Sequence, residues 1–165
     1  MTKVDDSRGP IAFATGAEVR DVALDVVRQS RRYLEIVSRN LEPIVYDTRE
    51  FVSAVKSMVT KNPKAEVRII VLRPDTLQGV HHHLIDLAQR LNSFISVRRP
   101  SADYWEFNEA MIIGDRRHVL HRRISDRFEG AAYFNAEGRA AKLLQVFNEV
   151  WEYGEPDPNF RQLIL

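Results

Sequence analysis

The run of residues 66–72, Glu-Val-Arg-Ile-Ile-Val-Leu, constrains the fold of this chain more than any other stretch. It is nearly continuous in Val, Ile and Leu, without the alternation of polar residues that a half-exposed strand shows. A short run of this kind is typical of a strand in a parallel sheet that is covered on both faces. The run therefore predicts an internal strand with helices on both sides.

Predicted helices and strands alternate along the rest of the chain. Thr15 and Glu18 fit a capping box, in which each side chain satisfies a free backbone amide at a helix start. Asp47 and Glu50 fit a second box, directly before an apolar stripe that begins at Phe51. The other predicted elements are strands at residues 11–14, 33–38 and 94–97, helices at 18–31, from 76 or 80 to 91 and at 137–153, and irregular chain at 122–135. This order favours an α/β layer fold with a mostly parallel central sheet flanked by helices on both faces.

Composition places the chain among soluble globular proteins. It has 165 residues, of which 44% are hydrophobic and 28% charged, and this length predicts one domain over residues 11–165 after a flexible arm, residues 1–10. The absence of cysteine excludes disulfides and thiolate metal sites. No apolar run is long enough for a bilayer span or a signal peptide, which predicts a cytoplasmic protein. Because the net charge is only +1, attraction to a polyanion must come from local patches.

Residues 108–120 predict a hairpin, and they carry a family resemblance. An apolar run ending at Ile113 is followed by turn chemistry at Asp115 and then by a second extended segment. The stretch resembles the His-x-Lys-x-x-x-x-Asp motif of the phospholipase D superfamily, with Asn108 at the His position, Ala110 at the Lys position and Asp115 at the Asp position. The predicted order of elements is the one that this resemblance implies for a phospholipase D-like half. On the residues alone, an ordinary turn residue is the alternative explanation of Asp115.

The two replacements remove the chemistry that the resemblance implies. In the family the His is the nucleophile that forms a covalent phospho-enzyme, and the Lys holds the negative oxygens of the phosphodiester. An amide nitrogen such as that of Asn108 has no lone pair with which to attack phosphorus, and Ala110 can neither donate a hydrogen bond nor offset charge. The family's Gly-Ser-x-Asn element is also missing after the hairpin. We therefore expect a degenerate, non-catalytic domain that needs no cofactor.

The resemblance also implies a homodimer, because active members with a single motif pair two halves around one site. It would place Asn108 and Asp115 of both copies near the dyad.

The five histidines are candidate sites of chemistry. Consecutive side chains on a helix point about 100° apart, so His81, His82 and His83 cannot converge on one metal ion, and we expect a solvated helix start there. His118 and His121 are three residues apart on a predicted strand and so point to opposite faces. They leave one enzymatic alternative open, a weak phosphodiesterase that uses one of them as a substitute nucleophile.

A basic run on the hairpin is the strongest indication of a ligand. Its arginines can form bidentate hydrogen bonds to phosphate oxygens, and nearby aromatic rings can stack on the bases of a single strand. The alternative is that these arginines face water or pair with acidic neighbours, while the aromatic residues cover the sheet edge. The candidate ligand-binding residues are Tyr104, Trp105, Arg116, Arg117, His118, His121, Arg122 and Arg123.

The main hypothesis is therefore a non-catalytic phospholipase D-like domain that binds nucleic acid or another phosphate-bearing ligand. The alternative from a different class is a protein-interaction or regulatory module of a larger bacterial enzyme system, associated with an acyltransferase-type domain.

Overall fold

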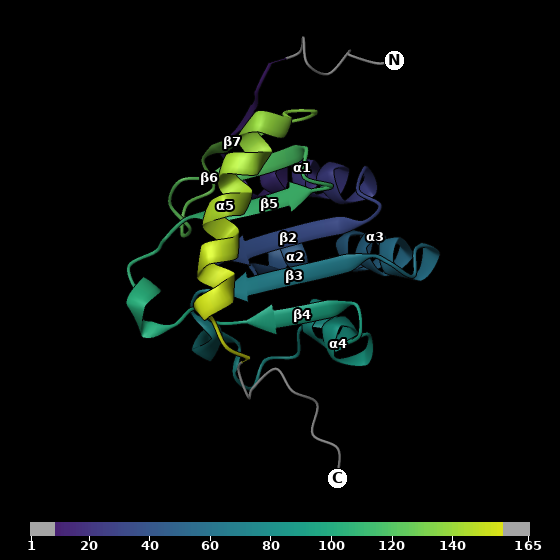
Figure 1. Ribbon diagram of the computed structural model, residues 1–165, viewed down its shortest axis with the longest axis vertical. Helices are drawn as coiled ribbons and strands as arrows, with labels where there is room; N and C mark the ends of the chain where they lie inside the picture. The colour runs from purple at the N-terminus through teal and green to yellow at the C-terminus, as the bar shows by residue number, and fades with distance from the viewer. Residues whose placement is uncertain (1–8, 157–165) are drawn as a thin grey trace.

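A computed structural model describes residues 9–156 of the chain, so most of the predicted arm and the last nine residues of the predicted domain lie outside the described part. Its centre is one seven-stranded sheet of strand order β1-β7-β6-β5-β2-β3-β4 (Figure 1). The strands are β1 Ile11–Phe13, β2 Tyr33–Ser38, β3 Glu66–Val71, β4 Ile95–Arg98, β5 Ala110–Gly114, β6 His118–Arg122 and β7 Gly130–Tyr133. The helices are α1 Gly16–Arg28, α2 Pro43–Tyr46, α3 Arg49–Lys61, α4 His83–Arg90 and α5 Glu137–Tyr153, with short 3-10 turns at η2 Pro74–Leu77 and η3 Ala102–Tyr104.

The sheet is mixed, so the prediction of a mostly parallel sheet is wrong. Only β2, β3 and β4 run parallel, whereas the β1/β7, β7/β6, β6/β5 and β5/β2 pairs are antiparallel. The reason lies in the connections: β5, β6 and β7 follow one another through short loops, and parallel neighbours would need a long crossover between them. Strand β7 also occupies part of the segment that was predicted to be irregular.

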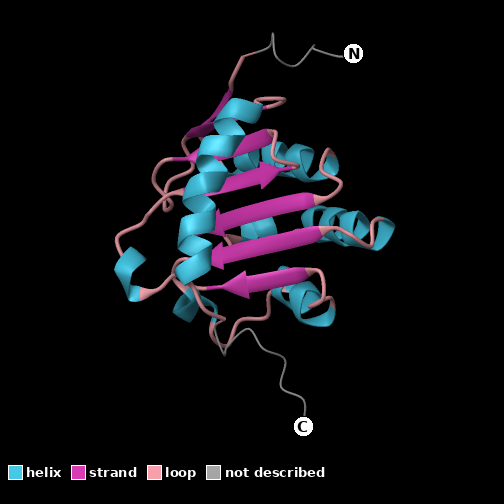
Figure 2. Cartoon of the chain, viewed as in Figure 1, coloured by secondary structure: helices cyan, strands magenta, loops and turns pink. Residues whose placement is uncertain are grey.

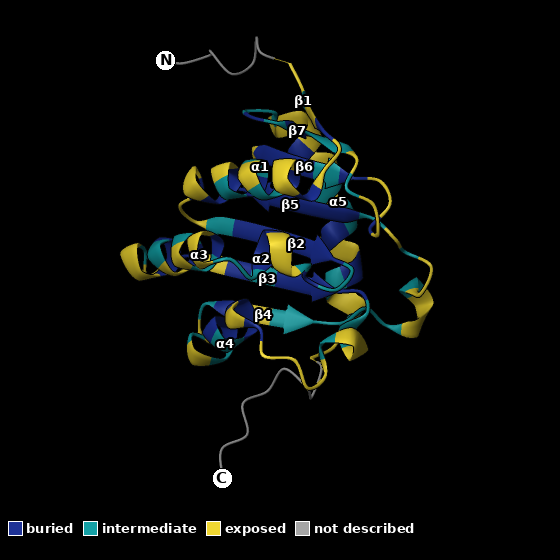
Figure 3. Ribbon diagram, turned by 180° about the vertical axis from the view of Figure 1, so that it is seen from behind, coloured by how far each residue is buried: buried dark blue, intermediate teal, exposed yellow. Residues whose placement is uncertain are grey.

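Helices cover both faces of the sheet, as predicted (Figure 2). Helix α5 crosses one face, and α1 to α4 cover the other (Figure 1). Consecutive side chains of β2 point to alternate faces of the sheet. Ile36 packs in the core beneath α1 and α3, and Val37 packs with Phe147 of α5 in the second core. Seen from behind, the central strands are mostly buried, β4 is of intermediate burial, and the outer sides of the helices are exposed (Figure 3).

One of the two predicted helix caps is present in the structure, and the other is replaced. Thr15 and Glu18 form the predicted capping box, with the Glu18 backbone N–H donating to the Thr15 hydroxyl and the Glu18 carboxylate accepting from the Thr15 N–H. The box predicted at Asp47 is wrong, because Thr48 caps α3 by accepting from the Phe51 N–H. The Asp47 carboxylate instead accepts from the backbone N–H of His83 at the start of α4.

Asp115 joins the β5–β6 turn to the segment that precedes β2. Asp115 and Arg116 both have positive φ, 49° and 58°, which suits the twist of a tight hairpin. The Asp115 carboxylate accepts three hydrogen bonds, from the backbone N–H groups of Arg31, Arg32 and Tyr33, at 2.8–3.0 Å. The aspartate of the motif therefore has a structural role here that goes beyond the turn.

We predict that Asp115→Ala lowers the free energy of unfolding by roughly 2 kcal/mol, because three amides lose their acceptor. Asp115→Asn, which keeps one carbonyl oxygen and tolerates positive φ, should cost about half as much. Urea denaturation of the two variants beside the wild type measures this difference. Equal losses for both substitutions would contradict the role of the carboxylate.

Candidate functional site

The position of the motif's first residue lies at one edge of the sheet, where the parallel strands β2 and β3 end and β5 begins (left end of the sheet in Figure 1). Backbone hydrogen bonds connect loops there that are distant in sequence. The N–H of Arg73 donates to the Arg39 carbonyl at 2.8 Å, and the N–H of Ser125 donates to the Asn108 carbonyl at 2.8 Å. The ends of parallel strands are a common place for ligands in open α/β sheets.

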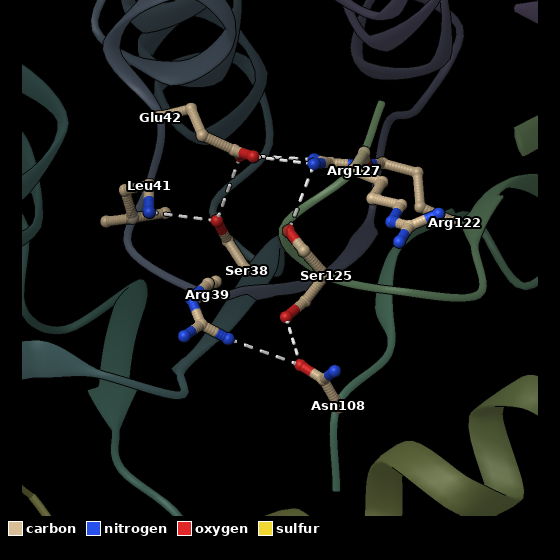
Figure 4. Close-up of polar contacts among 8 residues, drawn as sticks. All are labelled: Ser38, Arg39, Leu41, Glu42, Asn108, Arg122, Ser125 and Arg127. Carbon is tan, nitrogen blue, oxygen red and sulfur yellow. Dashed lines mark hydrogen bonds and ion pairs between the residues drawn. The ribbon is translucent and has the colours of Figure 1, made fainter. Parts of the chain in front are cut away.

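Asn108 is exposed and is held through its side-chain oxygen (Figure 4). This oxygen accepts from the Ser125 hydroxyl at 2.5 Å and from the Arg39 guanidinium at 3.4 Å. An amide held in this way cannot attack phosphorus, but its NH2 group can still donate to an anionic oxygen.

Two cationic side chains and an exposed aromatic ring stand beside Asn108. The Arg73 guanidinium lies 4.1 Å from the ring centroid of Trp105 and donates to the Trp105 carbonyl at 3.4 Å. Trp105 is 61% exposed. Within residues 9–156, neither Arg39 nor Arg73 has an acidic side chain at ion-pairing distance. We call the surface of Arg39, Arg73, Trp105 and Asn108 the Asn108 edge.

A buried ion pair lies directly behind the Asn108 edge. Arg122, 1% exposed, donates to both carboxylate oxygens of Glu42 at 3.1 and 2.6 Å, and also to the carbonyls of Ser125 at 3.0 Å and Arg127 at 2.7 Å (Figure 4). Burial is the strongest single influence and opposes the charge of Arg122, but the hydrogen bonds to Glu42 and the nearby Tyr46, Glu42 and Asp126 together raise the pKa of Arg122 overall. Ala110 is the direct cross-strand partner of Arg122, so the ion pair of Arg122 and Glu42 lies beside the position that corresponds to the motif's Lys.

The predicted arginines do not form one patch. Arg116 and Arg117 lie in the turn at the far end of β5 and β6, where Arg116 stacks at 3.8 Å over Tyr33. Arg122 is buried and committed to Glu42, which corrects its assignment as a ligand-binding residue; of the four, only Arg123 is exposed at the near end. Arg122 is the last residue of β6 and Arg123 the first residue of the loop that follows, and their adjacency in sequence hides this difference.

Asn108 and Asp115 also lie apart, at opposite ends of β5. The strand rise of about 3.3 Å per residue separates them by roughly 20 Å. They therefore do not share one pocket within a single copy.

The two strand histidines lie on opposite faces and are both engaged. His118 is buried, packs against Phe134, and its Nδ1 accepts from the Asn135 N–H at 3.2 Å. His121 pairs at 2.7 Å with Glu109, an acidic partner that the sequence reading missed. The cross-strand register explains the contact, because Met111 faces His121 and Glu109 is its diagonal neighbour on the same face.

The aromatic residues before β5 have different surroundings: two pack toward α5 and one is exposed. The Tyr104 hydroxyl donates to Glu149 of α5 at 2.8 Å, and its ring stacks on Tyr153. Phe107 packs in the core beneath α5. Only Trp105 is thus exposed at the Asn108 edge.

The histidine run precedes a helix that starts later than predicted. His82 caps α4, with its Nδ1 accepting from the Leu84 N–H at 3.2 Å, and its Nε2 donates to the Leu41 carbonyl at 3.0 Å. His82 is only 3% exposed, so the expectation of a solvated helix start is wrong for this residue. Among the described residues, no three His, Asp or Glu side chains are placed to share a metal ion.

Comparison with solved structures defines the class of fold. Nuc from Salmonella typhimurium, described as a phospholipase D family member, is 14% identical over 93% of this chain and 99% of its own, with a TM-score of 0.63. NucT from Helicobacter pylori is 11% identical over 90% of this chain and 98% of its own, with a TM-score of 0.64. TrmBL2, an archaeal chromatin protein with a novel mode of DNA binding, is 13% identical over 95% of this chain, which spans 56% of TrmBL2, with a TM-score of 0.66. The fold is therefore that of a phospholipase D-like half domain.

A family model described as "Domain of unknown function (DUF7931)" matches residues 15–163, so the chain belongs to this family. No curated protein matches the sequence. No helix within residues 9–156 is long and apolar enough to cross a membrane.

We predict that the stability of the protein depends on the protonation of His82. The pKa of His82 is lowered in the folded protein, chiefly by burial, so the unfolded chain takes up the proton at higher pH than the folded chain. The free energy of unfolding should therefore fall as the pH decreases from about 6.5 toward the folded pKa. His82→Asn keeps a capping oxygen but should lose this pH dependence. The measurement is the melting temperature of the wild type and the variant between pH 5 and 7.5. The same change of melting temperature with pH in both proteins would contradict the prediction.

We further predict that Arg122→Ala costs roughly 3 kcal/mol of stability, because it leaves Glu42 and two carbonyls without their donor. The neighbouring exposed variant Arg123→Ala is the matched control and should change stability by less than about 0.5 kcal/mol. Chemical denaturation of both variants tests the assignment. Similar small effects would show that Arg122 is not structural.

Proposed function

We propose that this protein is a non-catalytic phospholipase D-like domain that binds the phosphate backbone of nucleic acid at the Asn108 edge. The observation that carries the proposal is the pair of guanidinium groups, Arg39 and Arg73, that lack an acidic partner among the described residues and stand beside an exposed indole. Guanidinium groups bind phosphate oxygens bidentately, and the charge of an unpaired one is available for this.

Single-stranded nucleic acid is the form that this edge suits best. Exposed aromatic rings beside a basic surface bind single strands by stacking on bases, and Trp105 is such a ring. The DNA binding described for TrmBL2, which shares the fold, supports a polynucleotide as the partner. A small net charge fits local binding at one edge better than binding over the whole surface.

The absence of catalysis is part of the proposal. Asn108 stands at the nucleophile position with its oxygen already accepting from Ser125 and Arg39, and the ion pair of Arg122 and Glu42 adjoins the small Ala110. The two histidines that could replace the nucleophile lie on different faces of the sheet, where His118 is buried and His121 pairs with Glu109. We propose a cytoplasmic protein and a homodimer that joins two copies at their Asn108 ends.

The test is fluorescence anisotropy of labelled single- and double-stranded oligonucleotides at several salt concentrations. We expect salt-dependent binding that favours the single strand. The Arg39→Gln/Arg73→Gln variant should bind more weakly. Its plot of log K against log salt concentration should be less steep, by about one unit of slope for each lost phosphate contact. Trp105→Ala should cost about 1–3 kcal/mol on single strands. The matched control, Arg116→Gln/Arg117→Gln, removes the same charge at the other end of the hairpin and should bind as the wild type.

Loss of binding in the control but not in the Arg39/Arg73 variant would move the site to the hairpin turn. No binding at low salt would refute the proposal and favour the alternative of a protein-interaction module associated with an acyltransferase-type domain. Turnover of bis(4-nitrophenyl) phosphate that disappears in His121→Ala would establish the weak phosphodiesterase instead.

A further inference from the structure

A second basic site, which shares no residue with the Asn108 edge, lies on the α5 side of strands β6 and β7. It is a cavity of about 390 Å³. Its lining residues are His121, Arg123, Ile124, Arg127, Glu129, Gly130, Ala131, Tyr133 and Arg139. A cavity of this volume falls within the range of pockets that hold small molecules.

The charge of this cavity is strongly unbalanced. Three arginines, Arg123, Arg127 and Arg139, line it against one acidic side chain, Glu129. Within residues 9–156, none of these arginines has a carboxylate at ion-pairing distance. His121 is already paired with Glu109. The cavity therefore holds an excess positive charge that an anion would offset.

The arginines around the cavity are held in place by contacts with neighbouring residues. The buried Arg122 donates to the carbonyls of Ser125 and Arg127, which fixes the backbone of the loop that carries two of the arginines. The guanidinium of Arg139 lies 3.8 Å from the ring centroid of Tyr133. Donors held in a fixed geometry lose less entropy when they bind a ligand.

We propose that this cavity binds a small phosphomonoester of sugar-phosphate or nucleotide size. Three guanidinium groups match the charge and the acceptor oxygens of a phosphate dianion. The small side chain of Ala131 on the cavity-facing side of β7 leaves room for the body of the ligand. This site does not depend on the proposed nucleic-acid binding, since the two sites share no residue.

The experiment is a titration of the 15N-labelled protein, followed by NMR at low salt, with adenosine 5′-monophosphate, ribose 5-phosphate and adenosine. We expect saturable shifts at the amides of Gly130 and Ala131 with adenosine 5′-monophosphate. Saturation with ribose 5-phosphate as well would assign recognition to the phosphate, and saturation with the nucleotide alone would add the base to it. Adenosine should leave these amides unchanged.

Arg123→Gln/Arg127→Gln/Arg139→Gln should weaken binding at least about tenfold, because each charge-assisted hydrogen bond is worth more than a neutral one. The matched control is Arg28→Gln/Arg31→Gln/Arg49→Gln, which removes the same charge from a larger cavity, about 850 Å³, between α1 and α3. The control and Arg39→Gln/Arg73→Gln should both bind as the wild type.

Three results would overturn the proposal: no saturation in the millimolar range, equal binding of adenosine, or equal losses in the triple variant and its control. The spectra themselves report whether each variant is folded. Because the Arg39/Arg73 variant is tested in parallel, failure at this cavity is distinguishable from failure at the Asn108 edge.

Discussion

The contact on which both candidate sites depend is the buried pair of Arg122 and Glu42. Arg122 leaves the end of β6 and reaches the loop after β2, so one side chain ties together segments that are 80 residues apart. Its remaining N–H groups bind the carbonyls of Ser125 and Arg127 and so position the loop between β6 and β7. Ser125 in turn holds Asn108. A charge buried at this point is stable only because its partners are complete.

This arrangement shows how the fold is kept without the residues that the phospholipase D motif uses for chemistry. The motif's aspartate remains because its carboxylate organises the backbone before β2, which is a structural task. At the positions that correspond to the motif's His and Lys, this chain has the amide of Asn108 and the methyl group of Ala110. The neighbouring polar space is filled by an ion pair in which the charges satisfy one another.

The elements themselves were largely predictable, because local patterns decide them. The apolar run of β3, the Thr15 capping box and the stripe of α5 all lie where the sequence places them. The direction of the strands was not predictable in the same way, since it depends on which strands become neighbours. Strand β7, a short stretch of Gly, Ala and Tyr, has little pattern of its own and forms only because β6 and β1 pair with it.

The sequence by itself determined where the hairpin lies and which side chains it carries. Asn108 and Ala110 lack the nucleophilic and cationic groups that the resemblance leads one to expect at these two positions. Only the tertiary structure decided which cations are available to a ligand. Arg122 and Arg123 are neighbours in a basic run, yet one is buried against a carboxylate and the other is exposed. Arg39 and Arg73, which no pattern marks, come together because parallel strands end at the same edge of a sheet.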